Sequence, residues 1–403
     1  MIVKDKQYDV VAAGHICLDI IPQIPDTGAQ SMDQIFRPGT LVNVGPCAIS
    51  TGGPVSNTGV GAVKLGCRVA FMAKVGNDEH GQIIRRLLDE SGSSEGIRSA
   101  PNVTTSYTVA LAPPRIDRMF LHSPGANDTF TSDDIAYDLV ANAGQFHLGY
   151  PPLMRSLYEN DGRELAEIFR RAKEAGATTS LDMSLPDPAS PSGKAPWATI
   201  LANVLPHVDI FLPSMEEGFF MLHPEEFLAR KQKYGGGKLI DHITPAECSE
   251  MAGRFLDMGA CMTALKSGHR GYYFRTADKS TFSRMGAVKP ADLDGWSNRE
   301  VWFPAFHVDP IASATGSGDS SIAGFLASFL RGLRLEECLQ VANCAGHQNL
   351  HVLDAVSGIS NWDETWSMVT QGNLTIIDPK LDDTTWWQDE STRFWIGPHD
   401  ATS

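Results

Sequence analysis

The sequence predicts an α/β fold with a mostly parallel β-sheet and helices on both of its faces. Between residues 146 and 266, short apolar runs alternate regularly with segments of helical periodicity. Two glycine-rich turns, at residues 52–53 and 316–318, each open a further helical segment. Alternation of strands and helices requires crossover connections, which produce parallel strands covered by helices on both faces.

The first predicted strand, residues 8–14, is an apolar run that ends at Gly14. Asp19 follows it, where open α/β sheets place ligand contacts, although a turn or capping aspartate explains this residue equally well. Residues 22–50 are rich in Pro, Gly and Thr and favour loops and small strands, an arrangement that would suit a lid.

Residues 51–66 begin with Gly52 and Gly53 and predict a helix that ends at Gly66. The two glycines permit close approach of the backbone to a ligand, and Asn57 could donate and accept hydrogen bonds with a polyol. An ordinary first turn of a helix is the alternative.

The central part of the chain supplies most of the predicted sheet. Strand-like runs at 104–112 and 118–122 flank a Pro-Pro turn, while 231–241 and 284–304 are predicted to be an exposed loop and an irregular excursion. The other predicted strands are 67–75, 146–149, 178–182, 209–212 and 261–266, and the predicted helices are 82–90, 162–175, 196–205 and 245–258.

The segment 313–332 is a glycine-broken loop that runs into a helix. From Asp319 onward apolar residues recur at helical spacing, so Gly316, Ser317 and Gly318 lie at a helix N-terminus. The unpaired backbone N–H groups and the helix dipole make the start of a helix suitable for binding an anion. Asp319 could simply cap this helix, or it could take a proton from a hydroxyl while the loop N–H groups hold a transferring phosphoryl group.

The composition limits the classes of partner. The 403 residues carry 33 Lys and Arg against 48 Asp and Glu, and the net charge of −15 argues against nucleic acid or an acidic membrane surface. The start lacks the apolar stretch of a signal peptide, and no run reaches the ~18 apolar residues of a membrane span, so we expect a cytoplasmic protein. Seven cysteines without a Cys-x-x-Cys pair indicate neither a disulfide framework nor a zinc site.

Several common motifs are absent or incomplete. There is no Walker A loop and no His-Glu-x-x-His, and neither glycine turn completes a dinucleotide fingerprint. Glu216 and Glu217 follow a predicted strand and could hold magnesium through water, although an acidic first helical turn is the simpler explanation. His347 and His351 stand four apart on a predicted helix, but no third metal ligand is evident near them.

Taken together, these segments resemble the ribokinase-like, or PfkB, family of carbohydrate and nucleoside kinases. The match is carried by Gly52-Gly53-Pro-Val-Ser-Asn57 and by Ala314-Thr-Gly-Ser-Gly-Asp319. Shorter motifs stand in family order around them, namely Gly14 with Asp19, Val75-Gly-Asn-Asp78 with Gly81, Gly125-Ala-Asn127, and Lys266-Ser-Gly268 with Gly271. The likeness covers roughly residues 8–360.

The resemblance implies a ribokinase-like kinase domain over residues 1–370, followed by a C-terminal extension over 371–403. A small β lid would be drawn from about 15–50 and 104–122, with the sugar between the lid and the sheet. The extension also carries Trp386, Trp387 and Trp395. They could pack over the edge of the sheet or on another subunit, although a satellite cluster on the same chain is the simpler explanation.

The resemblance also implies a role for each matched residue. Asp319 would be the general base, Glu217 would organise Mg²⁺, and Gly316, Ser317 and Gly318 would supply the anion-hole N–H groups. Substrate hydroxyls would be bound by Asp19, Gly52, Gly53 and Asn57. The ATP pocket would be lined by Lys266, Ser267, Gly268, Gly271, Thr315 and Asn343.

Two positions depart from the family pattern. The family's Asn-x-x-Glu reads Ser214-Met-Glu-Glu217, which removes an amide near the phosphates and weakens the case for a magnesium role of this segment. The acid that usually opens the anion loop is Ser313, so we do not expect a potassium site. Neither change affects Asp319.

The sequence therefore predicts ATP-dependent phosphorylation of a sugar hydroxyl, with ATP and Mg²⁺ as cofactors. A nucleoside kinase of the same fold is the first alternative, and a catalytically weak sugar-binding regulatory protein, suggested by Ser214 and Ser313, is the second. A nicotinamide-dependent oxidoreductase has little support, because both glycine patterns are broken. The resemblance also suggests a homodimer formed through the lid, as is common in relatives.

Overall fold

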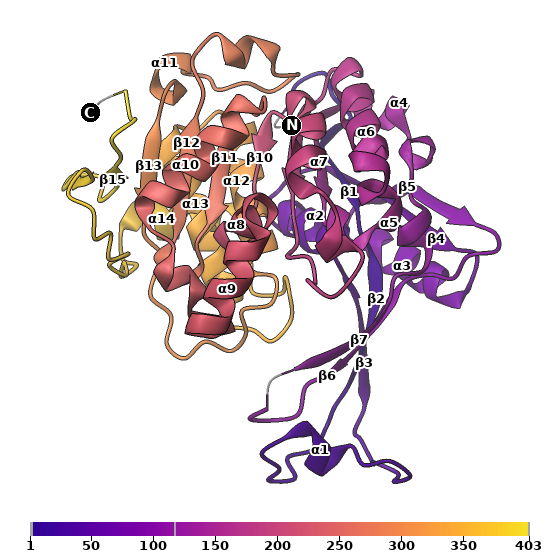
Figure 1. The fold of residues 1–403 in the computed structure, drawn as a ribbon. Coiled ribbons are helices and arrows are strands. Elements are labelled where there is room, and N and C mark those ends of the chain that lie inside the picture. Colours follow the sequence, from indigo (N-terminus) through magenta and orange to yellow (C-terminus); the bar gives the residue numbers. More distant parts are fainter. Residues whose placement is uncertain (1–2, 117, 402–403) are drawn as a thin grey trace.

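An eleven-stranded sheet lies between two layers of helices in the computed structural model, which describes residues 3–116 and 118–401 (Figure 1). Its strands are β1 (Tyr8–Gly14), β4 (Val69–Gly76), β5 (Ser93–Ala100), β8 (Ala143–Gly149), β9 (Thr178–Asp182), β10 (Ile210–Phe211), β11 (Met262–Lys266), β12 (Tyr272–Thr276), β13 (Glu300–Phe303), β14 (Trp387–Gln388) and β15 (Trp395–Ile396). Their order is β14-β15-β13-β12-β11-β10-β9-β8-β1-β4-β5. Neighbouring strands from β5 to β11 are parallel, and the other four extend the sheet in antiparallel pairs.

The two helical layers follow from the alternation of side chains along each strand. In β1, Val10 and Ala12 pack on one face of the sheet and Val11 and Ala13 on the other. The first face carries α2 (Pro54–Lys64), α3 (Glu79–Asp89), α11 (Leu293–Trp296), α12 (Ser317–Leu330) and α13 (Leu335–Asn349), with α14 (Trp362–Gln371) packed on α13. The second face carries α4 (Tyr137–Ala141), α5 (Arg155–Tyr158), α6 (Arg163–Glu174), α7 (Trp197–Val204), α8 (Met215–Leu222), α9 (Pro224–Tyr234) and α10 (Pro245–Asp257).

A second, four-stranded sheet projects away from this body (Figure 1). It contains β2 (Cys17–Pro22), β3 (Cys47–Gly52), β6 (Tyr107–Leu111) and β7 (Met119–Ser123) in the order β3-β2-β6-β7, and α1 (Met32–Ile35) lies between β2 and β3. The large, mostly parallel sheet and this small sheet confirm the predicted fold class. Residues 1, 2, 402 and 403 of the predicted kinase domain and extension, and residue 117 of the predicted lid, lie outside the described residues.

The prediction of an irregular excursion over residues 284–304 was wrong, because this segment contains α11 and the internal strand β13. Glu300 opens that strand and is fully buried. Its carboxylate accepts hydrogen bonds from the Tyr273 hydroxyl (2.7 Å) and from the backbone N–H of His399 (2.8 Å). With a charged residue in first position, only three consecutive apolar residues, 301–303, remain to mark this strand in the sequence. The loop expected at 231–241 likewise contains the end of α9 and most of a 3₁₀ helix, Gly236–His242.

The C-terminal extension, yellow in Figure 1, adds strands β15 and β14 to the large sheet beside β13. Trp386 packs against Tyr273 and Trp302 at ring-centroid distances of 6.0 and 6.1 Å, and Trp395 pairs with Trp302 in the ladder between β13 and β15. These two tryptophans therefore pack on the same chain. Within residues 3–116 and 118–401, no helix has both the length and the apolar character needed to span a membrane.

Candidate active site

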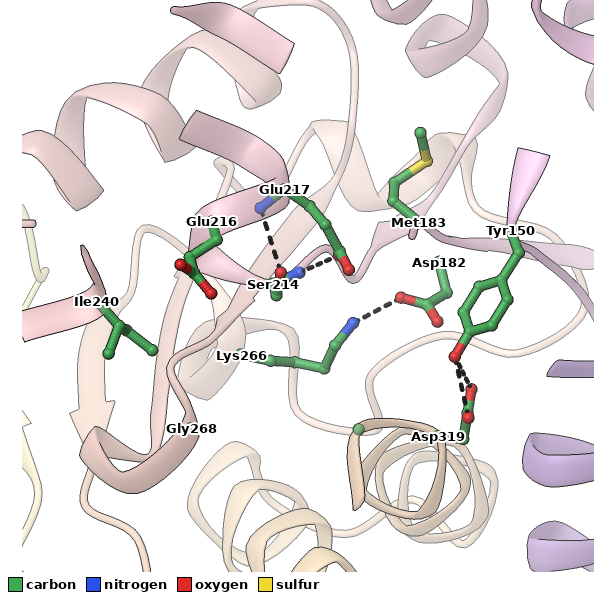
Figure 2. Close-up of a pocket in the computed structure, with 11 residues that line it drawn as sticks. Tyr150, Asp182, Met183, Ser214, Glu216, Glu217, Ile240, Lys266, Gly268 and Asp319 are labelled. Carbon is green, nitrogen blue, oxygen red and sulfur yellow. Dashed lines mark hydrogen bonds and ion pairs between the residues drawn. The ribbon is translucent and has the colours of Figure 1, made fainter. Parts of the chain in front are cut away.

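The carboxyl ends of the parallel strands meet the first turn of α12 at a cavity of about 270 Å³. Tyr150 follows β8, Asp182 ends β9, Lys266 ends β11, and Asp319 lies in the first turn of α12. All four line the cavity, and Figure 2 shows their polar groups converging. Open α/β sheets place their ligands at this edge, outside the carboxyl ends of the strands.

Asp319 is only 2% exposed and accepts hydrogen bonds from three other side chains. The Asn57 amide lies 2.9 Å from Oδ2, the Tyr150 hydroxyl lies 3.0 Å from each carboxylate oxygen, and the Thr58 hydroxyl lies 3.4 Å from Oδ1. Burial raises the pKa of Asp319, and the hydrogen bonds from Asn57 and Tyr150 oppose that shift. The side chain makes no capping bond to its own helix, whose N-cap is Gly316, so the simple cap explanation does not fit.

The backbone at the start of α12 takes a conformation that requires glycine. Gly316 has φ +72°, and a Cβ on it would lie 2.2 Å from the carbonyl oxygen of Ala355. The N–H of Ser317 donates to the carbonyl oxygen of Ala314 (3.3 Å), and Gly318 lines the cavity beside Asp319. The predicted anion loop is thus a tight turn that exposes a helix start to the cavity.

The four residues predicted to bind substrate lie where the small sheet meets α2, with Asp19 in β2, Gly52 at the end of β3, and Gly53 and Asn57 at the start of α2. Asn57 touches Asp319 directly, and its Oδ1 is buried with no hydrogen-bond partner among the described residues. A Cβ on Gly52 would lie 2.3 Å from Oδ2 of Asp19, and Gly53, with φ +90°, lies against the ring of His15. Burial raises the pKa of Asp19, while contacts with Cys17 and Thr108 lower it.

Lys266 carries the cationic charge in the cavity. Its ammonium lies 2.5 Å from Oδ1 of Asp182 and also donates to the carbonyl oxygen of Leu212. Burial by itself would lower the pKa of Lys266, but Asp182 and Glu217 raise it, so the ammonium stays charged. Burial raises the pKa of Asp182; Lys266 opposes this shift, and Glu217 and Asp319 add to it.

Glu217 lines the same cavity from the first turn of α8. Its Oε2 accepts the N–H of Ser214 (2.6 Å), while the Ser214 hydroxyl accepts the N–H of Glu217 (3.2 Å), so this serine caps the helix. Within residues 3–116 and 118–401, no group of three or more His, Cys, Asp or Glu side chains could hold a metal ion directly. His347 and His351 therefore have no third ligand of these types among the described residues. Mg²⁺ usually keeps several waters and one or two carboxylates, so Glu217 and Asp182 still fit a water-mediated site.

A second cavity of about 320 Å³ adjoins the first at Lys266, Gly268 and Gly318. Of the residues predicted to bind nucleotide, Lys266, Ser267, Gly268, Gly271 and Asn343 line it. Thr315 is not among the lining residues. It is exposed, its N–H donates to the Ser313 hydroxyl (3.0 Å), and its carbonyl oxygen accepts from Asn349 (2.9 Å).

Sequence reasoning missed four residues around these cavities. Tyr150 and Asp182 have been described, and the end of the predicted strand 178–182 could have marked Asp182. His15 is buried beside Gly53, and burial followed by the nearby His122 lowers its pKa to about 3, which keeps the imidazole neutral. Arg118, just before β7, donates to the Ser313 hydroxyl (2.5 Å) and joins the small sheet to the anion loop.

Comparison with known proteins places this geometry in context. A sequence model described as pfkB family carbohydrate kinase matches residues 9–359. Probable fructokinase-4 of Arabidopsis thaliana is 25% identical over 90% of this chain and 97% of its own, and 2-dehydro-3-deoxygluconokinase of Bacillus subtilis is 24% identical over 82% and 90%. The crystal structure of a putative ribokinase II from E. coli, in complex with ATP and Mg²⁺, superposes with a TM-score of 0.65 at 17% identity, covering 90% of this chain and 99% of that chain.

Proposed function

The chain belongs to the pfkB family of carbohydrate kinases, and we propose that it transfers the γ-phosphoryl group of ATP to a sugar hydroxyl with Asp319 as the general base. The observation that supports this most strongly is the hydrogen bond between Asn57 and Asp319, residues 262 positions apart in the sequence. It joins the glycine turn that opens α2 to the glycine turn that opens α12. The Asp319 carboxylate then belongs both to a polar site that can bind an alcohol and to an anion-binding site that can hold a phosphoryl group.

Each side chain has a separate task in the proposed reaction. Asp319 takes the proton of the attacking hydroxyl, and the unpartnered Oδ1 of Asn57 accepts a hydrogen bond from a neighbouring hydroxyl of the same sugar, which orients the substrate. The N–H groups at the start of α12 stabilise the negative charge of the transferring group, with Lys266 as the nearby cation. Tyr150 holds the Asp319 carboxylate by donating to both oxygens.

ATP and Mg²⁺ fit the residues around the two adjoining cavities. The second cavity lies within the range of about 300–1,000 Å³ that is typical of small-molecule sites, and it opens onto the anion loop at Gly318. The first cavity is lined by one cation, Lys266, and by more than one carboxylate, among them Asp182, Glu217 and Asp319. The resulting excess of negative charge suits an Mg²⁺ ion held through water. Bound together, ATP and Mg²⁺ supply the phosphoryl group and neutralise the charge on its oxygens.

The proposed substrate class is a sugar or sugar-like polyol. Asp19 and Asn57 present a carboxylate and an amide oxygen, which accept hydrogen bonds from hydroxyl groups. The relatives named above are a probable fructokinase and a 2-dehydro-3-deoxygluconokinase, so hexose-derived substrates are the first to try. A nucleoside kinase is the alternative of the same fold.

A coupled assay of ADP release separates these substrate classes. We expect ATP consumption with free ketohexoses or keto-deoxy sugar acids and none above background with adenosine or inosine. Turnover of nucleosides without turnover of any free sugar would overturn the sugar assignment.

We also propose that the lid forms a homodimer with a second copy of the chain. One aliphatic row crosses all four strands of the small sheet, with one residue from each strand directly opposite the next: Ile49, Ile20, Val109 and Leu121. Opposite residues point to the same face, and Ile49 and Leu121 are 50% and 53% exposed. Asp19 lies one residue away from Ile20 and points to the other face, toward the substrate site. An aliphatic row on the outer face is a surface that another apolar sheet would cover.

A further inference from the structure

The chain beyond α14 returns to the second cavity, although the family model that matches this protein ends at residue 359. Ile376 forms an antiparallel bridge with Phe306. The N–H of His307 donates to the carbonyl oxygen of Thr375, and the N–H of Ile377 donates to that of Ala305, both at 2.8 Å. Residues 375–377 are therefore fixed by backbone hydrogen bonds to the segment that leaves β13.

We infer that this C-terminal segment forms one wall of the ATP pocket and that the Ile377 side chain contacts the nucleotide base. The inference rests on the proposed kinase function, because it requires ATP in the second cavity. Ile377 lines that cavity together with Phe306, Val308, Ile311 and Leu350. Lys266 and Gly318 line both cavities and mark where this cavity joins the first.

The apolar and the polar residues that line the cavity suit the base and the phosphates of ATP, respectively. The phosphates carry the negative charge and belong beside Lys266 and the helix start at Gly318. An aromatic base placed at the same time must lie among the apolar side chains, because small-molecule sites bury most of a ligand against hydrophobic walls. Ile377 is one of these apolar side chains.

The wall is anchored on both sides of Ile377. Two residues later, the carbonyl oxygen of Pro379 accepts from Nε of Arg270 (3.3 Å). Further along, Trp386 packs on Tyr273 and Trp302, and Asp400 pairs with Arg299 at 2.9 Å in a buried position. The extension therefore holds Ile377 in a defined place.

Ile376 provides a matched control on the same segment. It is the same residue type one position earlier, packs against the apolar core on the α12 and α13 side of the sheet, and does not line the cavity. A change at Ile376 tests the general effect of disturbing the segment, and a change at Ile377 adds the effect of removing a pocket wall.

The test is calorimetric titration of the full chain with ATP and Mg²⁺ and, separately, with tripolyphosphate, which has the phosphates but no base. We expect Ile377→Ala to weaken ATP binding about tenfold, the size expected when a few methylene groups are lost from a hydrophobic pocket, and to leave tripolyphosphate binding unchanged. Ile376→Ala should keep ATP affinity within about twofold of the wild type. If Ile377→Ala does not fold, Ile377→Val should show a smaller loss in the same direction.

The outcomes separate this inference from the proposed function. A wild type that binds ATP, with an Ile377 variant that binds it equally tightly, would overturn the inference alone. Equal losses in the Ile376 and Ile377 variants, or a parallel loss of tripolyphosphate binding, would also overturn it. A wild type that binds no ATP would overturn the proposed function and this inference with it.

Discussion

Asp319 sits between two opposing influences on its protonation. Burial disfavours the carboxylate and raises its pKa, while the hydrogen bonds from Asn57 and Tyr150 favour the carboxylate and lower it. A general base must be deprotonated to act, so activity should rise with pH through the pKa of this group. By donating to the carboxylate, the hydroxyl of Tyr150 favours the ionised form that the proposed base requires.

We predict that Tyr150→Phe moves the acid limb of the pH profile of kcat/KM to higher pH. The substitution removes a donor to both carboxylate oxygens, which raises the pKa of Asp319 further above its ordinary value. The measurement is kcat/KM for the sugar across the acid range, because this parameter reports the ionisation of the free enzyme.

Tyr158→Phe is the matched control for this experiment. Tyr158 packs against Trp197 at a ring-centroid distance of 6.3 Å and lines neither the first nor the second cavity. Its variant should keep the wild-type profile. An acid limb that stays in place in Tyr150→Phe, or moves to lower pH, would show that Tyr150 does not act on the base.

The sequence predicted a role for Asp319 and Asn57 but gave no signal for Tyr150. The first two lie in glycine-rich motifs whose residue order is specific. Tyr150 lies in a turn after Gly149 with φ +62°, and no periodicity or motif predicts where such a side chain will point. The tyrosine could be recognised only once the ends of β8 and α12 were brought together.

At the scale of elements, the small sheet has one face that carries Asp19 and another that carries the aliphatic row of Ile49, Ile20, Val109 and Leu121. We predict that Leu121→Lys converts a dimer into a monomer, because it places a charge on the aliphatic row that would be buried against the second copy. Light scattering after size exclusion, across a range of protein concentrations, measures the mass.

Phe120→Lys is the control for the dimer prediction. Phe120 is 56% exposed on the same strand but points to the opposite face. It should leave the mass of a dimer unchanged. A wild type that is monomeric at every concentration, or a dimer that persists in Leu121→Lys, would contradict the proposed interface.

Elements with clean local signals were predictable, and others were not. The helix predicted over 245–258 is observed as Pro245–Asp257. Its start carries two local signals, a capping box formed by Thr244 and Glu247 and a proline at the first helical position. Strand β13 was missed because Glu300 is satisfied by Tyr273 and by the C-terminal segment, contacts that exist only in the folded chain.

At the scale of the whole molecule, the chain combines a strongly acidic balance with a proposed local binding site for anions. The net charge is −15, yet the helix start at Gly318 and the ammonium of Lys266 face the cavity. Arg118 reaches from the small sheet to Ser313 beside the same loop. The sequence indicated the separate motifs, whereas their meeting point depends on the packing of α2 against α12.

The central claim is that the two glycine turns bring a substrate hydroxyl to Asp319, and Asp319→Asn tests it most directly. We expect kcat to fall about 10²–10⁴-fold, the usual contribution of a positioned base, while calorimetry shows sugar and ATP binding close to that of the wild type. Asp134→Asn, which removes a carboxylate paired with Lys74 (3.0 Å) outside both cavities, should keep its activity. An Asp319→Asn variant that retains wild-type kcat, or a wild type that binds sugar but consumes no ATP above background, would contradict the account.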